Sequence, residues 1–396
     1  MDYAHHRPLG EGRLRRVRDA RRSVIHTRCF IVAGMNPAPG LLLGASLFAG
    51  PAAAGSLPFF VGTDADGVYA STLNTDTGKM SPPVLAGEMQ APGFLWIHPT
   101  LPVLYAVGGK GGESQLVAFA IGDDAQLTRV ASVGTGGKGA CFVTVSPDGR
   151  HAAVAHYGSG SVAVFPLGND GTPGEPAVTQ HTGRSVHEKR QTAPHAHSVR
   201  FTPDGRTLMA ADLGTDKLYV YGVTDAGGLE PASPPAVEMP PGSGPRHFVF
   251  APDGRSVLVL GELSGTVSIA PIDPVTGGVT QTVSAVADDL PADAERASAE
   301  ILFHPGGGYV YASNRGPGEV AWFAWDGEAL ERRGGVPGGG DWPRNFRLTG
   351  DGRFLLVANQ RSGNVASFRV DEETGEPVAT GQSVDVPGAM CIKFRR

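Results

Sequence analysis

The sequence predicts an all-β chain folded as a seven-bladed β-propeller. The main observation is a strand followed by a Pro-Asp-Gly type of turn, which recurs along the chain. Its turn position is occupied by Pro99, Pro147, Pro203, Pro252, Pro305 and Gly350, at spacings of 48, 56, 49, 53 and 45 residues. Proline presets φ at such a turn and glycine accepts positive φ, so each unit joins two strands. A strand-rich repeat near fifty residues, without helical periodicity, is typical of a propeller.

The two ends of the repeating region complement each other. The region begins at Phe59 with strands that no turn unit precedes, and the chain ends in a lone strand-like segment at residues 390–394. We expect this last strand to complete the first blade, because closing the ring hides the sheet edges. Six turn units and one split unit give seven blades. Blades two to seven are expected to begin near Phe94, Ala140, His195, Arg246, Ala299 and Arg344.

Composition excludes several classes of function. The 396 residues carry a formal net charge of −6, without a broad basic field, so nucleic acid is not an expected partner. The three cysteines lie far apart and nothing has metal-ligand spacing, so we expect no disulfide framework, no metal and no cofactor. The apolar run at residues 41–54 is too short and too broken to span a membrane. We expect a monomer that binds a small molecule.

Residues 1–55 differ in character from the expected propeller at residues 56–396. Residues 1–28 are strongly basic, and residues 41–54 are small and apolar. One interpretation is an export signal, which would send the protein to the periplasm. The other is an over-long start followed by a disordered leader, which would leave the protein in the cytoplasm. We take the cytoplasm as the expected location and export as the alternative.

Blade geometry predicts where a site lies. In a four-stranded meander, the connection into each inner strand lies on the same face as the loop between the second and third strands. These segments carry several histidines, arginines and asparagines, and we expect them to ring one mouth of the central channel. The candidates at blade starts are His195, His197, Arg246, His247, Arg344 and Asn345. The candidates in the second-to-third loops are Asp212, Glu262, Asn314 and Arg315.

Each candidate has a structural alternative. His195 or His197 could act as a general base or substrate clamp, or could hydrogen-bond the backbone at a blade start. Arg246 and Arg315 could bind an anion, or could form structural salt bridges with Glu262 and Asp212. Glu262 could itself be a base, or could support Arg246. The aspartates of the Pro-Asp-Gly turns belong to the opposite face and are interpreted as turn formers.

Eight ordered motifs resemble the seven-bladed propeller lactonase family, which includes the propeller type of bacterial 6-phosphogluconolactonase and the fungal muconate lactonising enzymes. The motifs include P-H-A-H-S-V, G-P-R-H, Y-A-S-N-R-G and W-P-R-N-F, and the resemblance covers about residues 59–394. It implies a site with one histidine, two arginines and one glutamate, which match His197 (or His195), Arg246, Arg315 and Glu262. Two departures are a longer segment at residues 181–193 and Gly261, where an asparagine is common.

The resemblance implies an enzyme, a lactonase of carbohydrate metabolism. Opening a sugar lactone needs a cationic group near the carbonyl oxygen and a base for the attacking water. The first hypothesis is hydrolysis of 6-phospho-D-glucono-1,5-lactone, a step of the pentose phosphate pathway. We assign catalysis to His197, Glu262 and Arg246, and substrate binding to the remaining candidates: His195, Arg315, Asp212, His247, Asn314, Arg344 and Asn345. The alternatives are a lactonase or cycloisomerase for another carboxylated lactone, and a non-catalytic propeller that binds a ligand.

Overall fold

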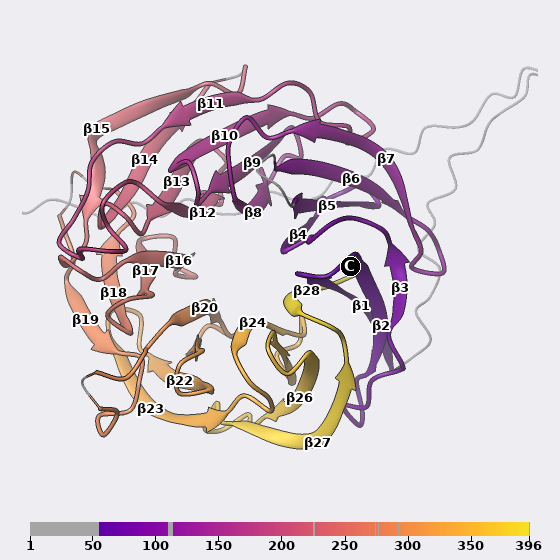
Figure 1. Cartoon of the computed structure of the whole chain (residues 1–396). Helices are drawn as coiled ribbons and strands as arrows, with labels where there is room; N and C mark the ends of the chain where they lie inside the picture. Colours follow the sequence, from indigo (N-terminus) through magenta and orange to yellow (C-terminus); the bar gives the residue numbers. More distant parts are fainter. Residues whose placement is uncertain are drawn as a thin grey trace, which may run out of the picture. The chain divides into compact units, whose positions relative to one another are not determined.

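The computed structural model describes residues 55–109, 114–224, 226–273, 275, 277–291 and 293–395. The predicted leader at residues 1–55 therefore lies outside the described residues except for Gly55. In the described part of the chain all regular structure is strand, and the strands form seven four-stranded antiparallel sheets. Figure 1 shows these sheets arranged as blades around a central axis. The predicted seven-bladed β-propeller is confirmed.

The strands of each blade run in order from the axis to the rim, and their bounds are as follows. The first blade contains β28 (Ala389–Phe394), β1 (Ser56–Thr63), β2 (Val68–Asn74) and β3 (Val84–Gly87). The second contains β4 (Phe94–Ile97), β5 (Val103–Gly108), β6 (Gln115–Ile121) and β7 (Leu127–Gly134). The third contains β8 (Ala140–Val145), β9 (His151–His156), β10 (Ser161–Pro166) and β11 (Ala177–Gln180). The fourth contains β12 (Ala196–Phe201), β13 (Thr207–Asp212), β14 (Lys217–Val223) and β15 (Leu229–Glu238).

The last three blades follow the same order. The fifth contains β16 (Pro245–Phe250), β17 (Ser256–Gly261), β18 (Thr266–Pro271) and β19 (Gln281–Ser284). The sixth contains β20 (Ser298–Phe303), β21 (Tyr309–Asn314), β22 (Glu319–Trp325) and β23 (Leu330–Pro337). The seventh contains β24 (Pro343–Leu348), β25 (Phe354–Asn359), β26 (Asn364–Val370) and β27 (Pro377–Asp385). Every blade start predicted from the repeat lies within one residue of the observed inner strand.

The C-terminal strand closes the ring. β28 pairs antiparallel with β1, with Phe59 opposite Phe394 and Val61 opposite Ile392. In Figure 1 the yellow C-terminal strand lies against the indigo strands of the first blade. The predicted closure is therefore confirmed: β28 covers the inner edge of β1 and takes the place of the inner strand in the first blade.

Burial explains why the middle strands are almost wholly apolar. All six residues of β5 and of β25 are buried, because each middle strand is covered by a neighbouring blade on both faces. In the rim strand β7, by contrast, the residues after Leu127 are exposed from Thr128 to Val130 and then alternate between half-buried and exposed. Apolar area buried between blades contributes about 25 cal/mol per Å² to the stability of the fold.

The Pro-Asp-Gly turns are closed by their own side chains. Asp204 accepts hydrogen bonds from the hydroxyl of Thr202 (2.6 Å) and from the backbone N–H of Arg206 (3.1 Å). Gly205 has φ +72°, a conformation that glycine adopts without strain. The interpretation of these aspartates as turn formers is confirmed for Asp204. Within the described residues, no helix is long and apolar enough to cross a membrane.

Candidate active site

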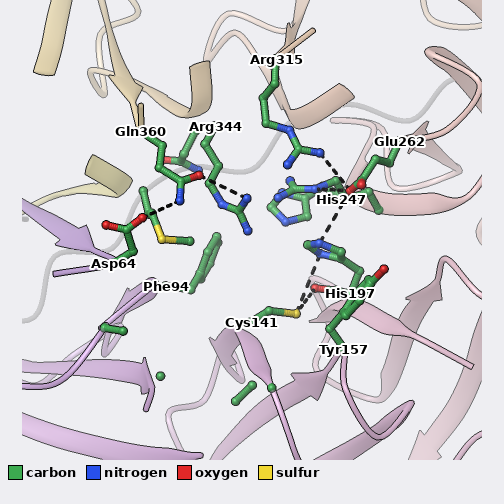
Figure 2. Close-up of a pocket in the computed structure, with 18 of the residues that line it drawn as sticks. Asp64, Phe94, Cys141, Tyr157, His197, His247, Glu262, Arg315, Arg344 and Gln360 are labelled. Carbon is green, nitrogen blue, oxygen red and sulfur yellow. Dashed lines mark hydrogen bonds and ion pairs between the residues drawn. The ribbon is translucent and has the colours of Figure 1, made fainter. Parts of the chain in front are cut away.

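A cavity of about 490 Å³ lies at the end of the central axis where the inner strands begin. Its wall combines the first residues of the inner strands with the loops between second and third strands, as the meander geometry predicts. Figure 2 shows the side chains that converge there. The chemically capable side chains lining the cavity are Asp64, Cys141, Tyr157, Arg190, His197, Arg246, His247, Glu262, Arg315, Arg344, Asn345 and Gln360.

A β-bulge near the start of each of several inner strands turns one side chain into this cavity. The strand register shifts by one residue against the second strand between Ala196 and Ser198, and again between Pro245 and His247. A bulged residue is left out of the ladder and its side chain is re-aimed. The bulged residues that line the cavity are Cys141, His197, Arg246, Arg344 and Met390. The same bulge, repeated in five blades, therefore places a thiol, an imidazole, two guanidiniums and a thioether at equivalent positions around the cavity.

A second equivalent position is the first residue after each second strand. In six of the seven blades this residue lines the cavity, and the set is Asp64, Gly109, Tyr157, Glu262, Arg315 and Gln360. The exception is Leu213, which follows β13 and is buried elsewhere. The loops therefore supply the carboxylates, one arginine and the phenol of the site.

Glu262 is held by three arginines. Its Oε1 accepts a 2.7 Å hydrogen bond from Arg190 Nη2, and its Oε2 lies 2.9 Å from Arg246 Nε and 3.1 Å from Arg315 Nη2. Burial acts to raise the pKa of the Glu262 carboxyl, but the three guanidiniums outweigh burial and lower that pKa to about 2. Glu262 is therefore a permanent carboxylate near neutral pH, and it fixes the positions of the arginines.

His197 presents an uncharged imidazole to the cavity. Its Nε2 lies 3.9 Å from Oε2 of Glu262, and its Nδ1 lies 4.0 Å from Sγ of Cys141. Burial, followed by the charge of Arg246, lowers the pKa of His197 well below its usual value. An imidazole that is uncharged at neutral pH has a nitrogen lone pair free to accept a proton.

The floor of the cavity is a second buried carboxylate, Glu300, which is held by hydrogen bonds from two uncharged side chains because burial lowers the pKa of His247 to about 4. His247 Nδ1 donates a 2.9 Å hydrogen bond to Glu300 Oε1, and the amide of Asn345 donates to the other oxygen of Glu300. Asn345 also accepts a 2.9 Å hydrogen bond from the backbone N–H of Ile392. Burial opposes ionisation of Glu300, but His247 and Arg200 lower its pKa to about 2. This floor ties the fifth, sixth, seventh and first blades together beneath the site.

Arg344 differs from the other three arginines of the cavity because no carboxylate in the described part of the chain pairs with it. Its Nη1 donates a long 3.4 Å hydrogen bond to Gln360 Oε1, and Gln360 in turn donates to Asp64 at 2.7 Å. Burial and the nearby Arg315 lower the pKa of Arg344 to about 10, so it remains a cation at neutral pH. Figure 2 shows Arg344 between Gln360 and the His197–Glu262 side of the cavity.

Three sequence candidates lie outside the cavity lining. Asp212 and Asn314 are the last residues of β13 and β21, one residue before the cavity-lining position. Successive side chains of a strand point to opposite sides, so a shift of one residue turns both away from the site. Asp212 pairs with His181 Nδ1 at 2.7 Å, and Asn314 donates a 2.6 Å hydrogen bond to the Ala285 carbonyl.

His195 also supports the wall without lining the cavity. Its Nδ1 donates a 2.7 Å hydrogen bond to the Tyr157 carbonyl, and its ring stacks on the Tyr157 ring with centroids 4.5 Å apart. This is the backbone-anchoring alternative considered for a histidine at a blade start. The remaining candidates line the cavity: His197, Arg246, His247, Glu262, Arg315, Arg344 and Asn345.

Sequence reasoning missed five lining residues: Asp64, Cys141, Tyr157, Arg190 and Gln360. Superposing the repeats at the residue after each second strand would have found Asp64, Tyr157 and Gln360. Arg190 belongs to the longer segment between β11 and β12, where no repeat position applies. The Cys141 thiol is adjacent to His197, but burial raises its pKa to about 11, so it is not an activated nucleophile.

Among the described residues, no three or more His, Cys, Asp and Glu side chains gather so that they could hold a metal ion. The fold and the cavity are those of a β-propeller with a candidate small-molecule site at one end of its axis. The chain belongs to the seven-bladed β-propeller lactonase family, whose model matches residues 58–394. It is thus a hydrolase of the lactonase type.

Named relatives and solved structures agree with this membership. The chain is 33% identical over 348 residues to the 6-phosphogluconolactonase of Bacillus subtilis, covering 85% of this chain and 97% of the relative. It is 31% identical over 355 residues to the 6-phosphogluconolactonase of Formosa agariphila, covering 85% and 98%. The structure of the periplasmic gluconolactonase of Pseudomonas aeruginosa superposes with a TM-score of 0.80 at 30% identity, covering 86% of this chain and 99% of that one.

Proposed function

We propose that this lactonase hydrolyses 6-phospho-D-glucono-1,5-lactone to 6-phosphogluconate, as a step of the pentose phosphate pathway. The observation that carries the substrate proposal is the charge of the cavity. Four guanidiniums line it, from Arg190, Arg246, Arg315 and Arg344, against the two carboxylates of Asp64 and Glu262. The excess of positive charge suits an anionic substrate, and arginine matches the geometry of a phosphate group.

In the proposed reaction, a water molecule attacks the lactone carbonyl carbon while His197 accepts the water proton. Negative charge then develops on the carbonyl oxygen, and Arg246, fixed by Glu262 and by the Ala299 carbonyl, stabilises it. The ring C–O bond breaks next, and the imidazolium of His197 returns the proton to the leaving alkoxide. The products are a carboxylic acid, which ionises, and a free hydroxyl group.

Glu262 acts in this proposal through other residues. A carboxyl with a pKa near 2 is a weak proton acceptor at neutral pH, which favours His197 over Glu262 as the base. The Glu262 carboxylate, 3.9 Å from His197 Nε2, stabilises the imidazolium that forms during the reaction. It also holds Arg246 and Arg315 in place, so we propose that Glu262 is a positioning residue.

Arg344 is proposed to hold the substrate phosphate. It is the cavity arginine without a carboxylate partner among the described residues, so binding an anion there breaks no existing ion pair. An incoming dianion would also oppose the cationic groups that lower the pKa of His197, and would make that imidazole a stronger base in the complex.

A second candidate substrate is the unphosphorylated D-glucono-1,5-lactone. It is favoured by the likeness to the periplasmic gluconolactonase of Pseudomonas aeruginosa. The two substrates also imply different locations, because sugar phosphates are cytoplasmic. We propose a cytoplasmic location with the first substrate and export with the second. Mass spectrometry of the N-terminus of the protein isolated from its source cell would distinguish an uncleaved chain from an exported one.

The test is acid release by purified protein from each lactone, corrected for the spontaneous hydrolysis measured without protein. We expect kcat/KM to be at least about tenfold higher for the phosphorylated lactone, a difference of about 1.4 kcal/mol in transition-state binding. A higher value for gluconolactone would select the second substrate. Turnover of neither would favour a lactonase or cycloisomerase for another carboxylated lactone, or a ligand-binding propeller.

A further inference from the structure

Tyr157 is a cavity-lining side chain that the reaction proposed above does not use. It is the first residue after β9, and it occupies the loop position that Glu262 and Arg315 occupy in later blades. Figure 2 shows it next to His197 and below Glu262. The ring centres of Tyr157 and His197 lie 5.6 Å apart, with the two planes at 75°. The phenol therefore belongs to the part of the wall beside the histidine that is proposed as the base.

The orientation of the Tyr157 ring is fixed by its neighbours. The imidazole of His195 stacks on the ring, with centroids 4.5 Å apart and planes 15° apart. The backbone of Tyr157 is held as well: its carbonyl accepts a 2.7 Å hydrogen bond from His195 Nδ1, and its N–H donates a 2.9 Å hydrogen bond to the Gly139 carbonyl. Because the side chain is already held in place, little conformational entropy is lost when it contacts a ligand.

The hydrogen bonds at the phenol oxygen leave its own hydrogen unused. Arg190 donates to this oxygen from Nη2 at 3.1 Å and from Nε at 3.4 Å. A guanidinium has donors and no acceptor, so the Tyr157 oxygen can only accept in both contacts. In the part of the chain that the structure describes, no atom accepts a hydrogen bond from the Tyr157 hydroxyl. Accepting from a cation also makes the phenol a stronger donor, because linked hydrogen bonds polarise one another.

The two side-chain amides of the cavity, by contrast, each donate within the protein. Asn345 donates to Glu300, and Gln360 donates a 2.7 Å hydrogen bond to Asp64. A sugar lactone carries several hydroxyl groups, and each of them needs a partner when the sugar leaves water for a cavity. The Tyr157 hydroxyl is therefore an uncharged donor that the protein leaves for such a group.

We propose that Tyr157 donates a hydrogen bond to the C2 hydroxyl of the sugar lactone and so determines specificity for lactones that carry this hydroxyl. As the base, His197 has to lie near the water that attacks C1, and C2 is the carbon bonded directly to C1. The C2 hydroxyl is therefore the substrate hydroxyl nearest to a donor beside His197. Both the phosphorylated and the unphosphorylated gluconolactone carry it, so this role of Tyr157 rests on the proposed function but holds for either substrate.

The test compares Tyr157→Phe with wild type on 6-phospho-D-glucono-1,5-lactone and on its 2-deoxy analogue. Phenylalanine keeps the ring that stacks on His195 and removes only the hydroxyl. We expect wild type to have the higher kcat/KM for the 2-hydroxy lactone, and Tyr157→Phe to reduce this preference about tenfold, as loss of one hydrogen bond to the substrate does. Comparing the ratio of the two kcat/KM values between the proteins cancels the difference in intrinsic reactivity of the lactones. If wild type prefers the unphosphorylated lactone, the same pair without phosphate is used.

Tyr309→Phe is the matched control and should leave the ratio unchanged, because Tyr309 begins β21 at the end away from the cavity and its hydroxyl donates to the Glu373 carbonyl at 2.6 Å. A crystal structure with bound 6-phosphogluconate should place the Tyr157 oxygen about 3 Å from the C2 hydroxyl oxygen.

An equal loss for both lactones in Tyr157→Phe would give the phenol a purely structural role, through Arg190, and would overturn the specificity role while leaving the lactonase function intact. A product complex with a different hydroxyl at the phenol would overturn it as well. No turnover of either lactone by wild type would instead overturn the proposed function, and the role of Tyr157 with it.

Discussion

Arg190 ties the connection between β11 and β12 to the carboxylate at the centre of the site, because its Nη2 donates a 2.7 Å hydrogen bond to Oε1 of Glu262. The same guanidinium donates to the Tyr157 hydroxyl at 3.1 Å. Its loop is anchored in turn by Gln191, whose amide donates a 2.8 Å hydrogen bond to the Leu213 carbonyl. The longer segment before the fourth blade is thus a structural part of the cavity wall.

Arg190→Met should therefore lower kcat for lactone hydrolysis about tenfold, because Glu262 loses one of its three cationic partners. Removing a cation also raises the pKa of Glu262 from about 2, so the acid limb of the pH–rate profile should move to higher pH. Arg190→Lys should restore part of the activity. Arg184→Met, an exposed residue of the same loop, is the control. An unchanged profile in Arg190→Met would show that the loop contact has no role in catalysis.

His197→Gln should lower kcat by about 10²-fold or more, the usual contribution of a general base. Because burial and the charge of Arg246 lower the pKa of His197 well below the ordinary histidine value, the imidazole stays uncharged until the pH falls well below that ordinary value. The wild-type rate should then decline only well below pH ~6.5, the ordinary pKa of histidine. His195→Gln removes a ring that stacks outside the cavity, so it should lower kcat far less. Equal losses in the two variants would contradict the assignment of the base.

Glu262→Gln should destabilise the fold near neutral pH, because it leaves buried guanidiniums without their carboxylate. The folded-state pKa of Glu262 is depressed from 4.5 to about 2, so its stabilisation is present above pH 4.5 and is lost as the pH falls towards 2. By linkage, the pKa shift of Glu262 corresponds to at most roughly 3 kcal/mol in the free energy of unfolding. Urea unfolding across this pH range should show a shallower pH dependence in Glu262→Gln than in wild type. The exposed Glu230→Gln should reproduce the wild-type curve.

Deleting residues 388–396 should sharply lower the melting temperature, because it removes β28 and exposes the inner edge of β1. A milder version is Ile392→Ala, which empties a fully buried position of β28 and should cost about 2–5 kcal/mol. Differential scanning calorimetry would measure both. A truncated protein that melts at the full-length temperature would show that closure by β28 does not stabilise the ring.

The propeller could be predicted because the same short sequence pattern, a strand followed by a turn, recurs in successive blades. A Pro-Asp-Gly turn or a degenerate copy of it follows the inner strand of blades two to seven and fixes the phase of these blades, so their starts were located within one residue. The end of the ring at which this cavity lies followed from the same connectivity. His197, Arg246, Glu262, Arg315 and Arg344 all line the cavity as expected.

What the sequence could not show is the direction of individual side chains. A bulge turns His197 into the cavity, while His195, two residues earlier, stacks on Tyr157. Asp212 and Asn314 were chosen as loop residues, but they end their strands and point away. Arg190 reaches Glu262 through a segment outside the repeat, and no local pattern marks that contact.

The most direct test of the substrate proposal compares the two lactones in wild type and in Arg344→Met. We expect Arg344→Met to raise KM for 6-phospho-D-glucono-1,5-lactone about tenfold or more, and to leave kcat/KM for D-glucono-1,5-lactone nearly unchanged, because Arg344 is proposed to contact only the phosphate. Arg361→Met, an exposed arginine whose guanidinium lies 3.3 Å from the Trp342 ring centre, outside the cavity lining, is the matched control. An equal loss for both lactones in Arg344→Met, or no loss for either, would contradict the account.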